Sequence, residues 1–215
     1  MIQWRPGEDI RMTATEIRDK YENFARWYDP GVWLSEVLVV RRLRRKLLKQ
    51  ARGHVLEVAV GTGANLEYYP RGIRLTAIDI SPSMLERAEQ KAKRLKLDAD
   101  FHVADIESFA PPGQSFDTIV SSMATCTFPD PVVSLEAMSR LCKPNGRILM
   151  IEHGRSSNRA LSAIQDSFAG YHVHALACHW NREPRELIDE AGLAIVSERH
   201  SFFGVFHAFE VKPSA

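Results

Sequence analysis

Apolar runs alternate with helical patterns along the middle of the chain. The runs lie at roughly residues 54–60, 74–80, 100–104, 116–121 and 146–152. Between them, residues 82–96 show the clearest helical pattern, with Ser81 placed to cap the helix and Pro82 in its first turn. Residues 130–141 form another such pattern, opened by Pro131. Alternation of this kind predicts a doubly wound, mostly parallel α/β sheet with helices on both faces.

The C-terminal part breaks this rhythm. After a helical pattern near residues 183–191, two apolar segments at 193–199 and 203–211 are separated by only a short connection. Too few residues remain for a crossover helix, so we expect the last strand to pair antiparallel. Two further helical stretches, about 12–28 and 32–50, precede the first strand.

Composition places the chain among ordinary globular proteins. It has 215 residues, 45% hydrophobic and 26% charged, with a net charge of +1. This size predicts a single domain, residues 1–215, and the charge gives no reason to expect a nucleic-acid partner. The N-terminus lacks the apolar core of a signal peptide, and no apolar run is long enough to span a membrane. We therefore expect a cytoplasmic protein.

Cysteine usage predicts neither a disulfide framework nor a metal site. Cys126, Cys142 and Cys178 are odd in number and far apart, without a Cys-x-x-Cys pair. The pair of histidines His172 and His174 lacks a carboxylate or cysteine at ligand spacing. We interpret Cys126 as a small buried apolar residue.

The most informative segment is residues 55–66, where an apolar strand pattern containing Glu57 runs into a turn with Gly61 and Gly63. Glycine lets a backbone approach a ligand closely. Asp79 ends the next apolar run, where a carboxylate can bind ribose hydroxyls. These features predict a nucleoside-cofactor site. A dinucleotide site would need a third glycine, but none follows Gly63 until Gly72.

Several motifs in order resemble the class I S-adenosylmethionine-dependent methyltransferases, over roughly residues 15–212. The Glu57-x-Ala59-x-Gly61-x-Gly63 pattern is similar to the first motif of that family, with Ala59 in place of its usual first glycine. The later segments that carry the resemblance are Asp79–Leu85, Ala104–Ile106, Phe116–Ser122 and Leu141–Leu149. The subgroup it resembles contains small, lidded enzymes that methylate quinone precursors, phospholipid amines or thiols.

The resemblance implies a seven-stranded Rossmann-like sheet with a reversed last strand and an N-terminal helical lid. It also implies S-adenosylmethionine as cofactor and S-adenosylhomocysteine as product. The residues expected to bind the cofactor are Glu57, Gly61, Gly63, Asn65, Asp79, Ile80, Met84, Asp105, Ile106, Ser122 and Tyr28.

Residues 1–50 are expected to form the helical lid and a basic helix, and residues 51–215 the cofactor-binding core. Tyr21, Phe24, Ala25 and Tyr28 share one helix face, which is either part of the core or a lid that excludes water. Basic residues crowd positions 41–52. They form either a solvated helix face or a surface for anionic lipid headgroups, which would place the protein peripherally at a membrane.

The acceptor is expected to lie beyond the ends of strands four and five, under an insert at about 154–182. His153, which follows the fifth strand, and Tyr21 are the candidate catalytic residues. Candidate substrate contacts are His172, His174, His179 and Arg182, and each of these histidines could instead be structural. In that alternative, Asn181 caps the helix that starts near Glu183.

The sequence thus predicts a methyltransferase that acts on a small-molecule or lipid-like acceptor, namely a quinone precursor, a phospholipid amine or a thiol. The alternative is a non-catalytic protein that uses the same fold to bind the cofactor or to serve as a scaffold. The acceptor atom is left open.

Overall fold

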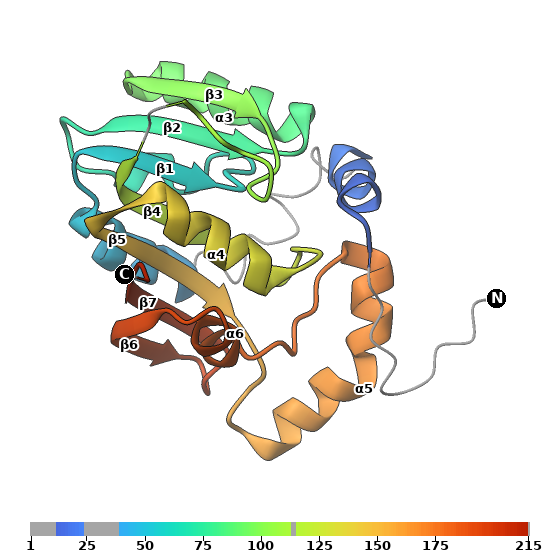
Figure 1. Ribbon diagram of the computed structural model, residues 1–215. Coiled ribbons are helices and arrows are strands. Elements are labelled where there is room, and N and C mark those ends of the chain that lie inside the picture. Colours follow the sequence, from blue (N-terminus) through green and yellow to red (C-terminus); the bar gives the residue numbers. More distant parts are fainter. Residues whose placement is uncertain (1–11, 24–38, 113–114, 215) are drawn as a thin grey trace.

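The computed structural model describes residues 12–23, 39–112 and 115–214, and these form a seven-stranded sheet (Figure 1). The strand order is β3-β2-β1-β4-β5-β7-β6. β7 is antiparallel to both of its neighbours, whereas the pairs among β1 to β5 are parallel. The predicted mostly parallel sheet with a reversed last strand is therefore confirmed. The strands are β1 His54–Val58, β2 Arg74–Asp79, β3 Ala99–Val103, β4 Phe116–Ser122, β5 Cys142–His153, β6 Ala194–Ser201 and β7 Phe206–Lys212.

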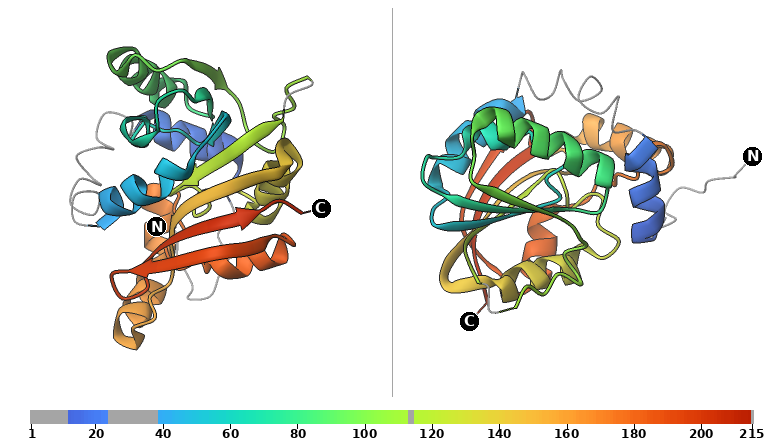
Figure 2. Two further views of the ribbon diagram at one scale, coloured as in Figure 1. Left: turned by 90° about the vertical axis from the view of Figure 1, so that its left-hand side faces the viewer. Right: turned by 90° about the horizontal axis from the view of Figure 1, so that it is seen from above.

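Helices cover both faces of the sheet, as Figure 2 shows in its right-hand view. Alternation along the strands sends neighbours to opposite sides, so Val55 packs with α2 (Arg41–Leu47) and α3 (Pro82–Leu95). Leu56 packs instead with α4 (Pro131–Leu141) and α6 (Pro184–Glu190). The sheet is thus buried between two apolar layers, which is why its central strands read as continuous apolar runs.

The predicted helix starts are confirmed for α3 and α4. The Ser81 hydroxyl accepts a hydrogen bond from the Met84 N–H at 3.2 Å, and Pro82 follows it. Asp130 caps α4 by accepting from the N–H groups of Val132 and Val133. The expected cap of α6 is wrong. Glu183 occupies the cap position, and Asn181 instead donates to Asp166 at 3.3 Å.

Two segments depart from the sequence-based expectation. The insert contains a long helix, α5 (Arg159–Leu176), which Asn158 caps and which the apolar pattern did not reveal. A strand–turn–helix–strand unit would start a regular helix after Gly63, but the chain there forms turns and a short 3-10 helix, η3 (Leu66–Tyr68). Figure 1 shows α5 beside the N-terminal helix that includes residues 14–23.

The basic stretch at 41–52 is only partly solvated. α2 is followed by the 3-10 helix η2 (Leu48–Gln50), and Leu43, Leu47 and Leu48 are buried against the sheet. Arg44 lies on this inner face and is only 5% exposed, because its spacing from the buried leucines turns it inward. The expectation that Arg44 belongs to an outer cationic face is therefore wrong. The neighbouring cations Arg41, Arg42, Arg45, Lys46, Lys49 and Arg52 are exposed.

Candidate cofactor and acceptor site

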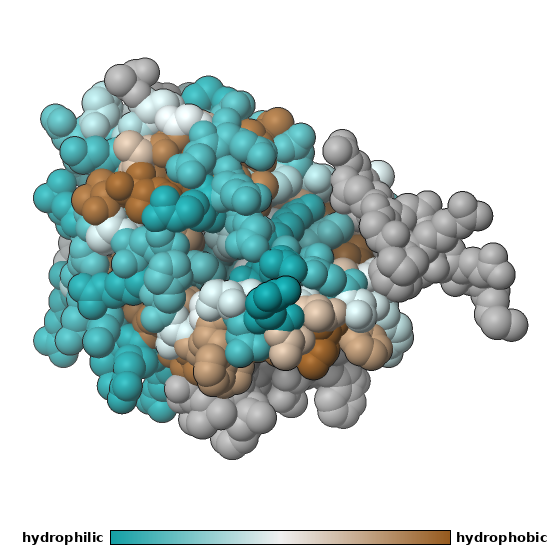
Figure 3. Space-filling model, turned by 90° about the horizontal axis from the view of Figure 1, so that it is seen from below, coloured by the Kyte–Doolittle hydropathy of each residue, from teal (hydrophilic) through white to brown (hydrophobic). Residues whose placement is uncertain are grey.

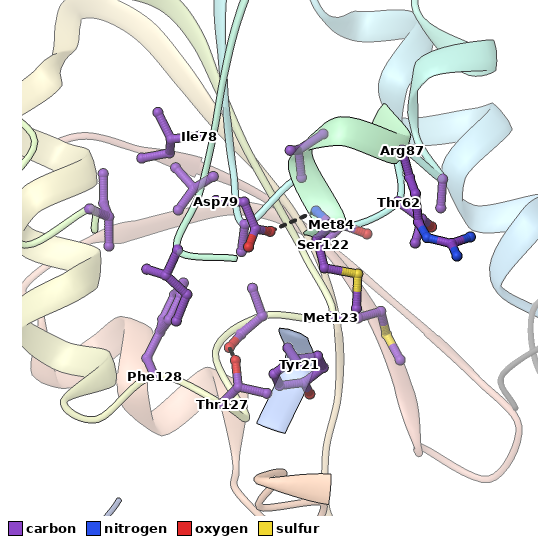
Figure 4. A pocket seen from close by; sticks show the side chains of 18 of the residues that line it. Tyr21, Thr62, Ile78, Asp79, Met84, Arg87, Ser122, Met123, Thr127 and Phe128 are labelled. Carbon is purple, nitrogen blue, oxygen red and sulfur yellow. Dashed lines mark hydrogen bonds between the residues drawn. The ribbon is translucent and has the colours of Figure 1, made fainter. Parts of the chain in front are cut away.

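A cavity of about 720 Å³ opens at the C-terminal ends of β1, β2 and β4. This is where ligands bind in open α/β sheets, and its volume lies within the range of small-molecule sites. Figure 4 shows Asp79 on one wall, with Tyr21 and Thr127 across from it. Of the predicted site residues, those that line the cavity are Tyr21, Gly61, Asp79, Ile80, Met84, Asp105, Ile106 and Ser122. Tyr28 lies outside the described residues.

Asp79 is held rigidly at the end of β2. One carboxylate oxygen accepts from the Gly61 N–H at 2.8 Å, and the other accepts from the Ser81 N–H at 2.9 Å. The side chain is 8% exposed and still borders the cavity. Burial raises the pKa of Asp79, while the two backbone donors oppose that rise. Because each carboxylate oxygen can accept more than one hydrogen bond, Asp79 retains capacity for ligand hydroxyls.

The turn after β1 is shaped for close approach by a ligand. Ala59 stands where the related motif has glycine, and it adopts a left-handed φ of 52° that is costly for a residue with a Cβ. Gly63 has a φ of 80°, and a Cβ there would lie 2.6 Å from Leu66. Gly61 has open space where its Cβ would be. The turn therefore lies with the Gly61 backbone at the cavity and carries local strain at Ala59.

Glu57 does not line the cavity but lies buried behind the turn. Its carboxylate accepts from Asn65 Nδ2 and from the Tyr69 hydroxyl, both at 2.9 Å. Asn65 in turn accepts from Arg44, which also donates to the Ser122 hydroxyl at 2.6 Å. Gly63 and Asn65, like Glu57, are not among the residues that line the cavity. Arg44, which sequence reasoning assigned elsewhere, lines the cavity and brings positive charge to it.

The burial of Glu57 makes stability depend on pH. Burial raises its pKa from 4.5 to about 7, although hydrogen bonds from Asn65 and Tyr69 oppose the rise. Between these two pH values the folded protein holds a proton that the unfolded chain has released, so this group lowers stability as pH increases. We expect Glu57→Gln to remove this dependence. In urea unfolding, the stability of the variant relative to wild type should increase by on the order of 2 kcal/mol between about pH 5 and pH 8. If the difference in stability between the variant and wild type stays the same from about pH 5 to pH 8, the raised pKa of Glu57 is contradicted.

The N-terminal helix closes one side of the cavity through contacts that the sequence did not reveal. Glu22 accepts from the Ser81 hydroxyl at 2.7 Å, from the Ser83 N–H at 3.1 Å and from the Ser83 hydroxyl. It thereby ties this helix to the start of α3. The N-terminal helix also contacts α5. The Tyr21 hydroxyl donates to the Leu176 carbonyl at 3.2 Å, and Lys20 donates to the His174 carbonyl. These contacts support the predicted lid.

We expect Glu22→Ala to weaken the closure without unfolding the core, because it removes acceptors at a helix N-terminus. Hydrogen bonds from Ser83 and Ser81 lower the Glu22 pKa, so the contact persists at neutral pH and is lost in acid. Stopped-flow release of S-adenosylhomocysteine should become about 3- to 10-fold faster. Asp19→Ala, an exposed position of the same helix that pairs with the adjacent Arg18, serves as the matched control. Equal rates in both variants would contradict the lid.

The predicted catalytic histidine lies behind the cavity wall. His153 ends β5, and its Nε2 lies 3.2 Å from Cys178 Sγ. Burial lowers the pKa of His153, but the neighbouring Cys126 and Glu152 raise it overall. Of the other candidates, His172 stacks on Trp180 at 4.4 Å and donates to the Cys178 carbonyl. Neither histidine lines the cavity.

The remaining predicted substrate contacts also lie outside the cavity. His174 is exposed on α5. His179 and Arg182 border a small separate crevice beneath Thr127 and Phe128. Arg182 donates to the Thr125 carbonyl at 2.6 Å and to the Phe128 carbonyl at 3.0 Å. Its position supports the acceptor-side loop from behind.

That loop, residues 123–129, forms the wall opposite Asp79. Met123, Thr127 and Phe128 line the cavity, and none of them was among the residues expected from sequence. Glu152 holds the start of the loop by accepting from the N–H groups of Ala124 at 3.1 Å and Thr125 at 3.3 Å. The loop is therefore clamped from both ends, by a buried carboxylate and by the Arg182 guanidinium. This rigidity gives the acceptor side a fixed shape.

Comparisons with known proteins agree with this geometry. A family profile described as a methyltransferase domain matches residues 56–150. The mitochondrial methyltransferase OMS1 of Saccharomyces cerevisiae is 30% identical over 90% of this chain. The matched region is 45% of the length of the yeast protein. A phosphatidylethanolamine N-methyltransferase of Cereibacter sphaeroides is 29% identical, over 69% of this chain and 75% of its own. The fold matches that of a DhpI–SAM–HEP complex with a TM-score of 0.70 and 19% identity, over 94% of this chain and 100% of the other.

Over residues 56–150 the chain matches a methyltransferase-domain profile. Together with the fold and the cavity at the strand ends, this similarity supports a class I S-adenosylmethionine-dependent methyltransferase. The cofactor that the similarity supports is S-adenosylmethionine. None of the helices in the described ranges combines the length and apolarity needed to cross a bilayer.

Proposed function

We propose that the protein transfers the methyl group of S-adenosylmethionine to an apolar small-molecule or lipid-like acceptor. One observation carries the proposal. The cavity joins a polar wall suited to the cofactor, around Asp79, to an acceptor-side wall formed by Tyr21, Met123, Thr127 and Phe128. An amphiphilic pocket of this kind suits a substrate with an apolar body and one nucleophilic atom.

The residues on the polar wall fit the three parts of the cofactor. The carboxylate of Asp79 suits the ribose hydroxyls, and Asp105 with Ile106 suits the adenine ring. The cations Arg41 and Arg44 border the cavity beside the turn, where they can meet the carboxylate of the methionine part. When bound, the cofactor supplies a methyl group already activated by its sulfonium, so the protein must mainly orient the acceptor and exclude water.

The residues that line the cavity favour an acceptor whose nucleophilic atom needs little proton removal by the protein. No histidine lines the cavity among the described residues, and Tyr21 is the candidate catalytic side chain that reaches it. A neutral amine or a readily ionised thiol needs less proton removal than an alcohol does. The similarity to a phosphatidylethanolamine N-methyltransferase supports a phospholipid amine as the first acceptor to test. We propose that Tyr21 orients the acceptor.

A turnover assay with matched acceptors tests this proposal. Phosphatidylethanolamine in mixed micelles is compared with free ethanolamine, which has the same amine without the acyl chains. A demethylated quinol and an alkyl thiol complete the panel. We expect kcat/KM for at least one apolar acceptor to exceed that for ethanolamine by about 100-fold or more, because remote binding energy contributes to catalysis. A kcat/KM for ethanolamine that equals or exceeds those of all the apolar acceptors would contradict an apolar acceptor site.

We also propose that the exposed cations of α2 and η2 contact an anionic membrane surface. Lys46 and Lys49 lie on the solvated side, while the leucines of the same stretch are buried. This makes the contact electrostatic, without an inserted apolar face. Figure 3, which views the molecule from below, shows a mostly hydrophilic surface with separate apolar patches.

Vesicle sedimentation tests the membrane contact. Binding to vesicles with anionic lipids should fall about 100-fold when Arg42, Arg45 and Lys46 are replaced by glutamine, since each cation contributes about 1 kcal/mol near such a surface. The matched control replaces the exposed cations Lys93, Arg94 and Lys96 at the end of α3. An equal loss in both variants would indicate a nonspecific charge effect and would contradict this site.

A further inference from the structure

Three side chains with metal-binding atoms meet behind the acceptor-side loop. The sulfur atoms of Cys126 and Cys178 and a ring nitrogen of His153 all lie within 4.8 Å of one another, and His153 Nε2 is 3.2 Å from Cys178 Sγ. They come from the loop after β4, the last residue of β5 and the segment after α5. Both cysteines are buried and reduced. We call this group the thiol–imidazole cluster.

The spacing of the three atoms suits a tetrahedral ion. With Zn–S bonds of about 2.3 Å and Zn–N bonds of about 2.0 Å, neighbouring donors around zinc lie roughly 3.4 to 3.8 Å apart. The atoms of the cluster are already within about 1 Å of this arrangement, so small side-chain rotations complete it. Two thiolates and one imidazole form a donor set that zinc takes in proteins, with a fourth position left for water.

Hydrogen bonds from outside the cluster fix the segments that carry it. The His179 N–H donates to the Cys126 carbonyl at 2.9 Å, which joins the two cysteine-bearing segments. The His172 ring donates to the Cys178 carbonyl at 2.9 Å. The imidazole of His153 is also hydrogen-bonded to the Trp180 backbone. A backbone partner of this kind orients the imidazole of metal-binding histidines.

We propose that the thiol–imidazole cluster binds one Zn²⁺ ion through Cys126, His153 and Cys178. The ion would fasten the acceptor-side loop to β5 and to the segment that follows α5. Thr127, next to Cys126, lines the cavity, so the metal would rigidify its wall without entering it. The proposal does not depend on which acceptor is methylated.

Two other arrangements compete with this one. A second group of donors, Glu198, His200 and His207, lies on β6 and β7. It is less suited to a cation, because the Arg185 guanidinium already pairs with Glu198 and the His200 side chain is 56% exposed. The other possibility is a disulfide between Cys126 and Cys178, which would need an oxidant.

Metal analysis of the purified full chain tests the proposal. Protein reduced with a phosphine and dialysed against Zn²⁺ should retain about one zinc per chain, measured by mass spectrometry. Replacement with Co²⁺ should give a thiolate-to-cobalt charge-transfer band and the visible bands of tetrahedral cobalt. Cys126→Ser, Cys178→Ser and His153→Asn should each lose the zinc. Cys142→Ser, a buried cysteine outside the cluster, and His200→Asn should retain it.

The cobalt spectrum is recorded on the wild-type protein, so the result does not depend on whether the variants fold. Absence of zinc and of the thiolate band in reduced, folded wild-type protein would overturn the proposal. Zinc retained in Cys126→Ser but lost in His200→Asn would place the ion at β6 and β7 instead. Equal rates of Cys126–Cys178 disulfide formation in air, with and without saturating zinc added to the reduced protein beforehand, would also contradict it, because bound zinc should protect the two thiolates from oxidation.

Discussion

Replacing Glu152 with leucine should lower the free energy of unfolding by roughly 2 to 4 kcal/mol. The carboxylate is fully buried and accepts from the Ser121 hydroxyl at 3.1 Å and from the N–H groups of Ala124 and Thr125. Leucine has a similar volume but accepts nothing, so three donors would stay buried without partners. Urea unfolding followed by circular dichroism measures the loss.

Glu152→Gln is the matched control for this prediction. The amide oxygen can still accept from the two backbone donors, and the Ser121 hydroxyl can rotate to accept from the amide nitrogen. We expect the glutamine variant to lose less than half as much stability as the leucine variant. A leucine variant as stable as wild type would show that the loop after β4 does not depend on this carboxylate.

The second large effect is expected at Asp79. Asp79→Ala should weaken binding of S-adenosylhomocysteine by about 1 to 3 kcal/mol, which corresponds to roughly 5- to 150-fold in Kd. Two causes combine, because alanine removes the proposed ribose acceptor and also releases the N–H groups of Gly61 and Ser81. Isothermal titration calorimetry gives the change directly.

Asp100→Ala, a surface carboxylate on β3 paired with Arg74, controls for general loss of negative charge. Asp79→Asn separates the two causes, since the amide keeps one acceptor for the backbone but loses the charge. An Asp79→Ala protein that is folded and binds with wild-type affinity would disprove the ribose contact.

Much of the fold could be predicted because its signals are local. The apolar runs of β1 to β5 can each be recognised within a few residues. The capping residues Ser81 and Asp130 also lie directly beside the helices that they begin. The cofactor side of the cavity could be predicted for the same reason. Asp79 and Asp105 end or follow strands that the pattern already locates, and both border the cavity.

The rest of the site depends on contacts between distant segments. Glu22 reaches Ser83 at 61 positions away, and Arg44 reaches Ser122 at 78 positions away. Neither has a local signal, although the spacing of Arg44 from Leu47 and Leu48 could have indicated its inward face. The placement of His153 illustrates the same difficulty. The sequence correctly puts it at the end of β5, but the loop after β4 separates it from the cavity.

Transfer of the methyl group to an acceptor distinguishes a working methyltransferase from a cofactor-binding scaffold. The most direct measurement follows labelled methyl from S-adenosylmethionine into the amine, quinol and thiol acceptors of the panel, together with formation of S-adenosylhomocysteine. We expect one labelled methyl group in an apolar acceptor for each S-adenosylhomocysteine formed, with little turnover by Asp79→Ala at subsaturating cofactor. Tight cofactor binding without transfer of label to any acceptor in the panel would contradict a working methyltransferase and favour the scaffold.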